Sequence, residues 1–377
     1  MSMTNKKKEV GIGLIGSGFM GKAHANAFRS VVGFFNLPIV PHLEILAEIN
    51  EEKAKEASLN LGFDKYTDDW KTLISNPKVD IVAITVPNKL HEKIALAAIE
   101  NGKAVYCEKP LSINAFSAKK MRDAAKAKRV ITMVGFSFLQ NPMIKLAKEI
   151  IKSNEIGKIL SFKGIHAENY MHQDVPHSFR TENNAGGGAL MDLGSHIISL
   201  ARYLLGPIVE VVGIEENLIN NRANENNANE FSKVEVDDRS VFISRFKNNV
   251  TGTFEACWSY TGSKMNLGFE ITGTKGAIKF NQEKMNEILI YKTDMKSGRD
   301  GFTRIESGPE HNPYNNFCPA PGHHLGFNDL KIIEVSELLK AYATQSQSFP
   351  DFEEAYQVQC IIDAVKISSN KKIWTKV

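Results

Sequence analysis

The sequence contains little cysteine and no C-x-x-C pair. Its four cysteines, Cys107, Cys257, Cys318 and Cys360, are scattered along 377 residues. This usage argues against a disulfide framework and against a zinc site built on cysteine, and it is typical of proteins in a reducing compartment. We therefore expect a cytoplasmic protein.

Long apolar runs are also missing. The longest apolar stretch, around Val31 to Ile49, is interrupted by Pro38 and Pro41 and carries charge, so we expect no segment to span a membrane. The first ten residues, MSMTNKKKEV, contain lysines but no apolar core behind them, unlike a secretory signal.

An excess of charge of one sign is absent too, because the formal net charge is only +3. No basic stripe with interleaved aromatic residues occurs, so nucleic acid is not an expected partner. The 42% of apolar residues and 24% of charged residues exclude a disordered chain. The length indicates two domains, which we place at 1–140 and 141–377.

The first 140 residues alternate between strand and helix patterns. Short apolar runs rich in Val and Ile predict strands at 9–16, 42–49, 80–86, 103–108 and 129–136. Helical periodicity between them predicts helices at 20–31, 50–61, 89–100 and 114–128. This alternation predicts an α/β Rossmann domain, a doubly wound parallel sheet with helices on both faces.

The pattern changes after residue 141. A helix at 143–153 precedes alternating strands, which we place at 158–168, 210–217, 240–246, 251–258 and 266–273. We predict an α+β domain with a mostly antiparallel, open sheet. The Asn-rich stretch 217–230 is expected to be a surface loop, and the helices at 330–341 and 352–369 to be amphipathic covers.

A glycine motif lies between the first strand and the first helix. In Gly16-Ser-Gly18-Phe-Met-Gly21, Gly16 permits a tight turn, Gly18 leaves room for a pyrophosphate, and Gly21 lets helix and strand pack closely. The helix N-terminus offers free N–H groups to the anion. The alternative is a glycine-rich turn without a ligand, but the strand before it and the helix after it favour a dinucleotide site.

Two charged residues stand where strands of this domain end. Glu48 can accept hydrogen bonds from the adenosine ribose and repel a 2′-phosphate, which favours NAD over NADP, or it is simply solvated. Lys109 lies at the carboxyl edge of the sheet, where open α/β folds bind ligands, and Pro110 keeps it out of helical geometry. Alone, such a lysine is more often just solvated.

A second constellation follows the glycine run 186–188. Asp192 and His196 are four residues apart, so they share one face of the predicted helix. They are either a capping aspartate and an ordinary helix histidine, or part of a reactive site with Lys109. Removing a hydride from a secondary alcohol requires loss of the hydroxyl proton; histidine suits that task, a lysine stabilises the alkoxide, and an aspartate orients the pair.

These motifs, in this order, resemble the Gfo/Idh/MocA family, the glucose–fructose oxidoreductase and inositol dehydrogenase group. The resemblance covers almost the whole chain and rests on GLIGSGFMGKAHANAF, ITVPNKLHEKIALAAIENGKAVYCEKP and GGGALMDLGSHIISLARYLLG. It implies an NAD(P)-dependent oxidoreductase acting on a secondary hydroxyl of a sugar, anhydrosugar or cyclitol. The catalytic residues would be Lys109, Asp192 and His196.

The two predicted domains would have different functions. Residues 1–140 would bind the dinucleotide, and residues 141–377 would bind substrate and mediate assembly into a homodimer or homotetramer through the open sheet. Beside the glycines, Glu48 and Lys109, the cofactor would be lined by Phe19, Met20, Thr85, Pro87, Asn88, His91 and Glu108.

One segment departs from the family pattern. Members often carry a Tyr-Arg pair in G-F-x-Y-R-x-x-P, whereas this chain has Phe138 and Leu139 there, so its substrate contacts are expected to differ. Arg180 precedes the glycine run and is a further candidate for the substrate pocket. With no arginine-rich motif beside the reactive trio, a neutral polyol or sugar is the expected substrate.

Three other interpretations remain. An NAD-dependent glycoside hydrolase would use transient oxidation, and a non-catalytic dinucleotide-binding regulator would be expected to lose the lysine or the histidine, both of which this chain keeps. A zinc site would draw on residues that lie close in sequence, namely His166, His172, Asp174 and His177. Their spacing fits neither a helix face nor a strand face, so we expect no metal.

Overall fold

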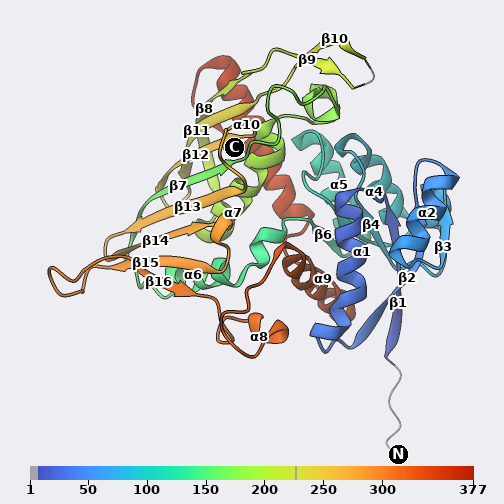
Figure 1. The fold of residues 1–377 in the computed structure, drawn as a ribbon, viewed down its shortest axis with the longest axis horizontal. Coiled ribbons are helices and arrows are strands. Elements are labelled where there is room, and N and C mark those ends of the chain that lie inside the picture. The colour runs from blue at the N-terminus through green and yellow to red at the C-terminus, as the bar shows by residue number, and fades with distance from the viewer. Residues whose placement is uncertain (1–6, 226) are drawn as a thin grey trace, which may run out of the picture. The chain divides into compact units, whose positions relative to one another are not determined.

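The computed structural model describes residues 7–225 and 227–377, and the chain forms two compact units (Figure 1). Unit 1 consists of Met1–Ser112, Phe116–Ser137 and Gly326–Tyr356; unit 2 consists of Ile113–Ala115, Phe138–Leu325 and Gln357–Val377. The start of the MSMTNKKKEV segment lies outside the described residues, so the expectation about a leader stays untested. No helix in the described ranges is both long and apolar enough to cross a bilayer.

Unit 1 contains a parallel sheet in the order β3-β2-β1-β4-β5-β6. Its strands are β1 (Lys8–Ile15), β2 (Ile39–Ala47), β3 (Lys65–Thr67), β4 (Ile81–Ile84), β5 (Ala104–Cys107) and β6 (Thr132–Val134). Its helices are α1 (Phe19–Phe34), α2 (Glu51–Leu61), α3 (Trp70–Ser75), α4 (His91–Glu100), α5 (Ala115–Lys128) and α9 (Phe327–Thr344). The predicted doubly wound Rossmann fold is confirmed, and its strand order reverses between β1 and β4, where such folds bind ligands.

The helix α9 differs from the amphipathic cover that we predicted. Lys331, Glu334 and Ser336 are buried along with its apolar side chains. It lies beside α1, because Phe327 stacks on Phe19 and Lys340 sits over the ring of Phe35 (Figure 1). The sequence-based division assigns this helix to the second domain, whereas its contacts group it with unit 1.

Unit 2 is built on a nine-stranded sheet in the order β16-β15-β14-β13-β7-β12-β11-β8-β17. These strands are β7 (Ile159–Ala167), β8 (Ile208–Glu216), β11 (Arg239–Phe246), β12 (Thr251–Cys257), β13 (Asn266–Gly273), β14 (Gly276–Asn281), β15 (Glu287–Lys292), β16 (Thr303–Glu306) and β17 (Thr375–Lys376). All neighbours are antiparallel except β7 and β12, so the predicted mostly antiparallel sheet is confirmed. The helices are α6 (Pro142–Lys152), α7 (Ser195–Leu205), α8 (Tyr314–Phe317) and α10 (Phe352–Lys371), which begins in unit 1.

The Asn-rich stretch is not simply a loop, so that prediction was wrong. Strands β9 (Asn221–Asn224) and β10 (Asn227–Lys233) form an antiparallel hairpin, while Asn226 lies outside the described residues. The hairpin is anchored by Arg222, whose guanidinium is fully buried and pairs with Asp238 at 3.4 Å. The same guanidinium donates to the carbonyls of Met171, His172 and Val175 at 2.7 to 3.1 Å.

Replacing Arg222 with Met should destabilise the protein strongly, because Asp238 would be left as a buried charge without its cation. The expected loss is about 3–5 kcal/mol of unfolding free energy, measured by denaturant titration. The control is Lys128→Met, which breaks the exposed pair with Glu100 and should cost less than about 1 kcal/mol. Equal losses in the two variants would contradict the anchoring role of Arg222.

Candidate functional site

The glycine turn in unit 1 has the features of a phosphate cradle. Gly16 has a φ of +93°, a conformation that side chains disfavour. A Cβ on Gly21 would lie 2.2 Å from the carbonyl oxygen of Gly16, whereas a Cβ on Gly18 would meet nothing within 4 Å. Gly18 is also the N-cap of α1, and no side chain caps that end. The turn is thus tightly packed on its inner side and open where a pyrophosphate would approach the helix N-terminus.

Two predicted cofactor residues hold this turn in place. The hydroxyl of Thr85 donates to the carbonyl oxygens of Gly16 at 2.8 Å and of Ile15 at 3.1 Å. The Glu48 carboxylate, just after β2, accepts the N–H and the hydroxyl of Ser17 at 2.8 and 2.7 Å. Burial would raise the pKa of Glu48, but hydrogen bonds from Ile49 and Ser17 lower it, so the carboxylate is ionised at neutral pH.

The carboxyl ends of β4 and β5 are joined by His91. This buried ring lies 2.9 Å from the carbonyl oxygen of Val86 and 3.0 Å from that of Pro110. Burial lowers the pKa of His91, so the ring is neutral and donates to one of these carbonyls at a time. Of the other predicted cofactor residues, Pro87 is exposed and Asn88 begins a short 3₁₀ turn before α4.

The half-buried Lys109 follows directly on Glu108, and its backbone N–H donates to Glu108 Oε2 at 3.2 Å. The other carboxylate oxygen of Glu108 is held inside unit 1 by Lys331 Nζ at 2.7 Å and His24 Nε2 at 2.8 Å. Sequence reasoning assigned Glu108 to the cofactor and did not find either partner. Its contact with the cofactor stays a prediction.

In unit 2, Asp192 lies in a π-helical turn, Leu190–Gly194, that leads into α7. Its Oδ2 accepts the phenol of Tyr170 at 2.6 Å and lies 3.6 Å from the guanidinium Nε of Arg180. Burial and the neighbouring Asp192 charge raise the pKa of Tyr170 well above its usual value, so the phenol stays protonated and can donate. The structure thus brings together two predicted residues and one, Tyr170, that sequence reasoning missed.

His196 sits in the first turn of α7 and is largely buried. The ring of Phe138 meets its imidazole edge-on with centroids 4.8 Å apart, and the ring of His166 lies 5.5 Å away. His166 in turn contacts the carbonyl oxygen of Leu193 at 2.9 Å and the carboxylate of Glu168 at 3.0 Å. Because Lys109 belongs to unit 1 and His196 to unit 2, their predicted convergence stays a prediction.

The residues considered for zinc are not gathered in one place. His166 is buried against Leu193, whereas the side chains of His172 and Asp174 are exposed. Across residues 7–225 and 227–377, one other group, His42, Glu44 and Asp64, has ligating atoms within 4.8 Å of one another. Lys65 Nζ lies 2.7 Å from Glu44 there, so the group forms an ion-pair network.

Two family models match this chain. The oxidoreductase family with an NAD-binding Rossmann fold matches residues 10–136, and the GFO/IDH/MocA C-terminal domain matches residues 144–279. The chain belongs to the Gfo/Idh/MocA family of oxidoreductases. The family resemblance inferred from the three motifs is therefore confirmed.

Comparison with individual proteins extends the similarity over almost the whole chain. Levoglucosan dehydrogenase of Pseudarthrobacter phenanthrenivorans is 36% identical, and the alignment covers 98% of each chain. Myo-inositol 2-dehydrogenase of Thermotoga maritima is 26% identical over 76% of this chain and 79% of its own length. A solved structure of levoglucosan dehydrogenase in complex with NADH and levoglucosan superposes with a TM-score of 0.95 at 37% identity, covering 98% of this chain and 100% of the other.

The glycine turn allows a test that separates dinucleotide binding from stability. Gly18→Ala places a methyl group in open space, so the melting temperature should hardly change, while NADH affinity should fall at least about tenfold because the pyrophosphate loses its close approach. Gly21→Ala should lower both, because its Cβ collides with the backbone of Gly16. Calorimetric titration with NADH and thermal unfolding are the two measurements. Unchanged NADH affinity in Gly18→Ala would refute the cradle.

Proposed function

We propose that this chain is an NAD-dependent dehydrogenase that oxidises a secondary hydroxyl of a neutral sugar, with an anhydrosugar such as levoglucosan as the first candidate. The observation that carries the proposal is the full-length match to levoglucosan dehydrogenase, whose solved structure contains NADH and levoglucosan. Cyclitols are the second candidate class, since inositol dehydrogenases are among the relatives.

The residues of unit 1 fit a dinucleotide. The open space above Gly18 and the uncapped start of α1 suit a pyrophosphate, and the ionised Glu48 beside Ser17 suits ribose hydroxyls while opposing a 2′-phosphate. Phe19, Met20, Thr85, Pro87, Asn88, His91, Glu108 and Lys109 complete the proposed cofactor site. Bound NAD would supply the acceptor for the hydride.

The protein's own residues then have to handle one proton and one developing negative charge. His196 would accept the hydroxyl proton, because imidazole titrates near neutral pH. Lys109 would stabilise the alkoxide through its ammonium group. Asp192 would supply a negative charge to the site. The hydrogen bond from Tyr170 and the ion pair with Arg180 would fix the orientation of its carboxylate.

The state of Arg180 supports a neutral substrate. Its guanidinium already pairs with Asp192 at 3.6 Å, and its charge is therefore partly balanced within unit 2. Phe138, whose ring meets His196 edge-on, and Leu139 are buried and apolar, where members of the family often carry a Tyr-Arg pair. A phosphorylated or carboxylated substrate would need a cation that is not already committed to a carboxylate.

The alternatives differ from this proposal in their products. A glycoside hydrolase with transient oxidation would release two sugars and consume no net NAD, and a regulator would bind the dinucleotide without turnover. The presence of Lys109, Asp192 and His196 together favours a dehydrogenase.

Substituting the reactive residues tests the mechanism. His196→Ala should lose roughly 10²–10⁴-fold in kcat with levoglucosan and NAD, the usual scale for general acid–base catalysis. Lys109→Ala should also lose kcat strongly, while NADH affinity changes little. NADH formation at 340 nm measures turnover, and a panel of neutral sugars, cyclitols and sugar phosphates identifies the substrate class.

The control is Lys103→Ala, since Lys103 Nζ binds the carbonyls of Asn76 and Val79 in unit 1, at the opposite end of β5 from Lys109. Near-normal turnover in both Lys109→Ala and His196→Ala would overturn the mechanism and favour the non-catalytic interpretation. A marked preference for a sugar phosphate, abolished by Arg180→Ala, would overturn the neutral-sugar part.

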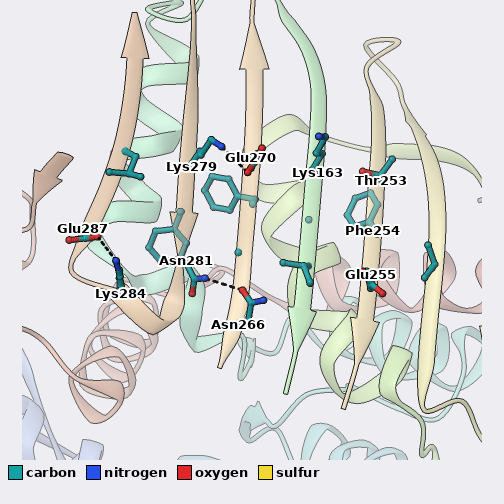
Figure 2. A pocket seen from close by; sticks show the side chains of 17 residues that line it. Lys163, Thr253, Phe254, Glu255, Asn266, Glu270, Lys279, Asn281, Lys284 and Glu287 are labelled. Carbon is teal, nitrogen blue, oxygen red and sulfur yellow. Dashed lines mark hydrogen bonds and ion pairs between the residues drawn. The ribbon is translucent and has the colours of Figure 1, made fainter. Parts of the chain in front are cut away.

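We also propose that the protein is a homodimer or homotetramer that pairs through the outer face of the unit 2 sheet. This face has a hollow of about 610 Å³ that is lined by charged side chains such as Lys163, Glu270 and Lys279 (Figure 2). On β8 and β11, the Arg245–Glu210 pair and the exposed Ile214 and Ile243 lie on the same face, and the Glu270–Lys279 pair lies further along the sheet on β13 and β14. A face with apolar residues and both signs of charge can be complementary to a second copy of itself.

The four free cysteines support a cytoplasmic location, which cell fractionation would test.

Light scattering at micromolar concentration should show a dimer or a tetramer. Ile214→Asp with Ile243→Asp should give a monomer with unchanged circular dichroism, because these side chains are 52% and 41% exposed in the single chain and would be buried in the assembly. Leu59→Asp on α2, 75% exposed, is the control and should leave the assembly intact. A wild-type protein that is monomeric would refute the proposal.

A further inference from the structure

Five polar or charged side chains meet in the core of unit 1, close behind Lys109. Lys331 Nζ is central: it lies 2.7 Å from Glu108 Oε1, 2.8 Å from Glu334 Oε2 and 3.0 Å from the Tyr106 hydroxyl. His24 Nε2 lies 2.8 Å from Glu108 and 3.4 Å from Lys331 Nζ. All five are buried, and the side chains of His24, Lys331 and Glu334 have no exposed surface.

The cluster joins three elements that matter for the dinucleotide site. His24 belongs to α1, which begins at the glycine turn; Glu108 follows β5 and precedes Lys109; and Lys331 belongs to α9. One turn before Lys331, Phe327 stacks on Phe19 of the glycine motif with centroids 5.6 Å apart. The helix α9 therefore contacts both the glycine turn and the strand end that carries Lys109.

The Glu108 carboxylate is packed closely against Gly135 and the backbone of Lys109. A Cβ on Gly135 would lie 2.5 Å from Glu108 Oε1, so the glycine after β6 makes room for the carboxylate. Glu108 Oε2 accepts the backbone N–H of Lys109 at 3.2 Å. The carboxylate thus connects the buried cation directly to the backbone of Lys109.

The electrostatics are those of a charged pair with a second carboxylate beside it. Burial alone would raise the pKa of Glu108, but the Lys331 ammonium and the His24 hydrogen bond hold it below its usual range. Burial lowers the pKa of Lys331, yet Glu108 and Glu334 together raise it, so the ammonium is retained. Burial raises the pKa of Glu334, and burial with the Lys331 charge lowers that of His24 to about 4.

We infer that Lys331 is a positioning residue, which fixes Glu108 and so holds the backbone of Lys109 in a set relation to the glycine turn. This inference rests on the proposed function, in which Lys109 stabilises the alkoxide. A buried ion pair is usually no more stabilising than an apolar pair of similar volume, so stability alone does not account for it. A misplacement of about 1 Å in a reacting group costs roughly a hundredfold in rate, so a rigid link behind Lys109 has a direct consequence for catalysis.

The experiment compares Lys331→Met, Glu108→Gln and the double variant, with Lys340→Met as the control on an exposed part of α9. Glu108→Gln keeps an oxygen that accepts from Lys331, so amide exchange in the segment 107–111 should stay within about threefold of wild type, and its kcat is the reference for the double variant. Lys331→Met should lose about 10–100-fold in kcat, with NADH affinity within about threefold. Lys340→Met should match wild type in kcat and in stability.

Thermal unfolding as a function of pH separates two effects of Lys331→Met: the buried Glu108 charge without a cation, and the displacement of the Lys109 backbone. In Lys331→Met the buried Glu108 has no cation, so its pKa in the folded state rises above the ordinary value of 4.5. A raised folded pKa means that stability is retained below that value and lost as pH rises, so the gap in melting temperature to wild type should widen from pH 4.5 to pH 8. Glu334 is unchanged in Lys331→Met and in the double variant. The double variant should therefore differ less from wild type in melting temperature, and that difference between the two variants reports on the charge of Glu108.

The deciding measurement is made on the double variant, which lacks the buried charge at position 108 and should therefore be more stable than Lys331→Met. Positioning predicts that kcat remains about 10–100-fold low and that amide exchange in the segment 107–111 stays about tenfold faster than in wild type. A purely structural role predicts that both recover with the melting temperature, and that result would overturn the inference. If the wild-type enzyme oxidises no sugar on the panel, the proposed function fails; amide exchange of 107–111 still decides the positioning role.

Discussion

A charge in a protein core must have a partner, and each unit of this protein contains a fully buried cation that meets this requirement. In unit 1, Lys331 pairs with Glu108 and Glu334; in unit 2, Arg222 pairs with Asp238. The desolvation of an unpaired ammonium or guanidinium would cost several kcal/mol, comparable with the whole stability of many domains. The segments that contain the partner carboxylates Glu108, Glu334 and Asp238 are therefore fixed in position.

The fixed segments are the ones that carry the proposed functional residues. Arg222 donates to carbonyl oxygens in the stretch that follows Tyr170, and Asp238 accepts the indole N–H of Trp258, whose ring packs edge-on against Tyr170. Tyr170 then donates to Asp192. A chain of contacts thus runs from a buried ion pair to a candidate catalytic carboxylate, as another runs from Lys331 through Glu108 to the backbone of Lys109.

The sequence reveals the parts of the fold that depend on local pattern. Strands β1, β4 and β5 are continuous apolar runs, and the glycine motif has a local steric cause, so both could be predicted. The three-residue strand β3 has exposed or half-exposed side chains, and no pattern marks it. The hairpin of β9 and β10 depends on one long-range anchor, Arg222, hidden among asparagines, so composition alone misassigned it.

The candidate site was predictable to the same extent. Lys109, Asp192 and His196 belong to recognisable motifs, whereas Tyr170 and Lys331 act across 22 and 223 residues of sequence, which no local motif encodes. One signal was available for α9: Lys331 and Glu334 are three apart inside LKIIEVSELL, where helical periodicity places both charges among apolar residues. Charges at such positions indicate a buried pair, and a cover helix would not need them.

The departure from the family pattern at Phe138 has a structural meaning within unit 2. Phe138 is buried and meets the imidazole of His196 edge-on, while His166, held by Glu168 and the Leu193 carbonyl, lies beside the same ring. The phenyl ring therefore restricts the orientation of His196 and shields one part of it from water, a task that needs no hydroxyl. If the Tyr-Arg pair of other members recognises substrate, that recognition has to come from other polar groups here; Tyr170 and Arg180, which both contact Asp192, are the candidates that we propose.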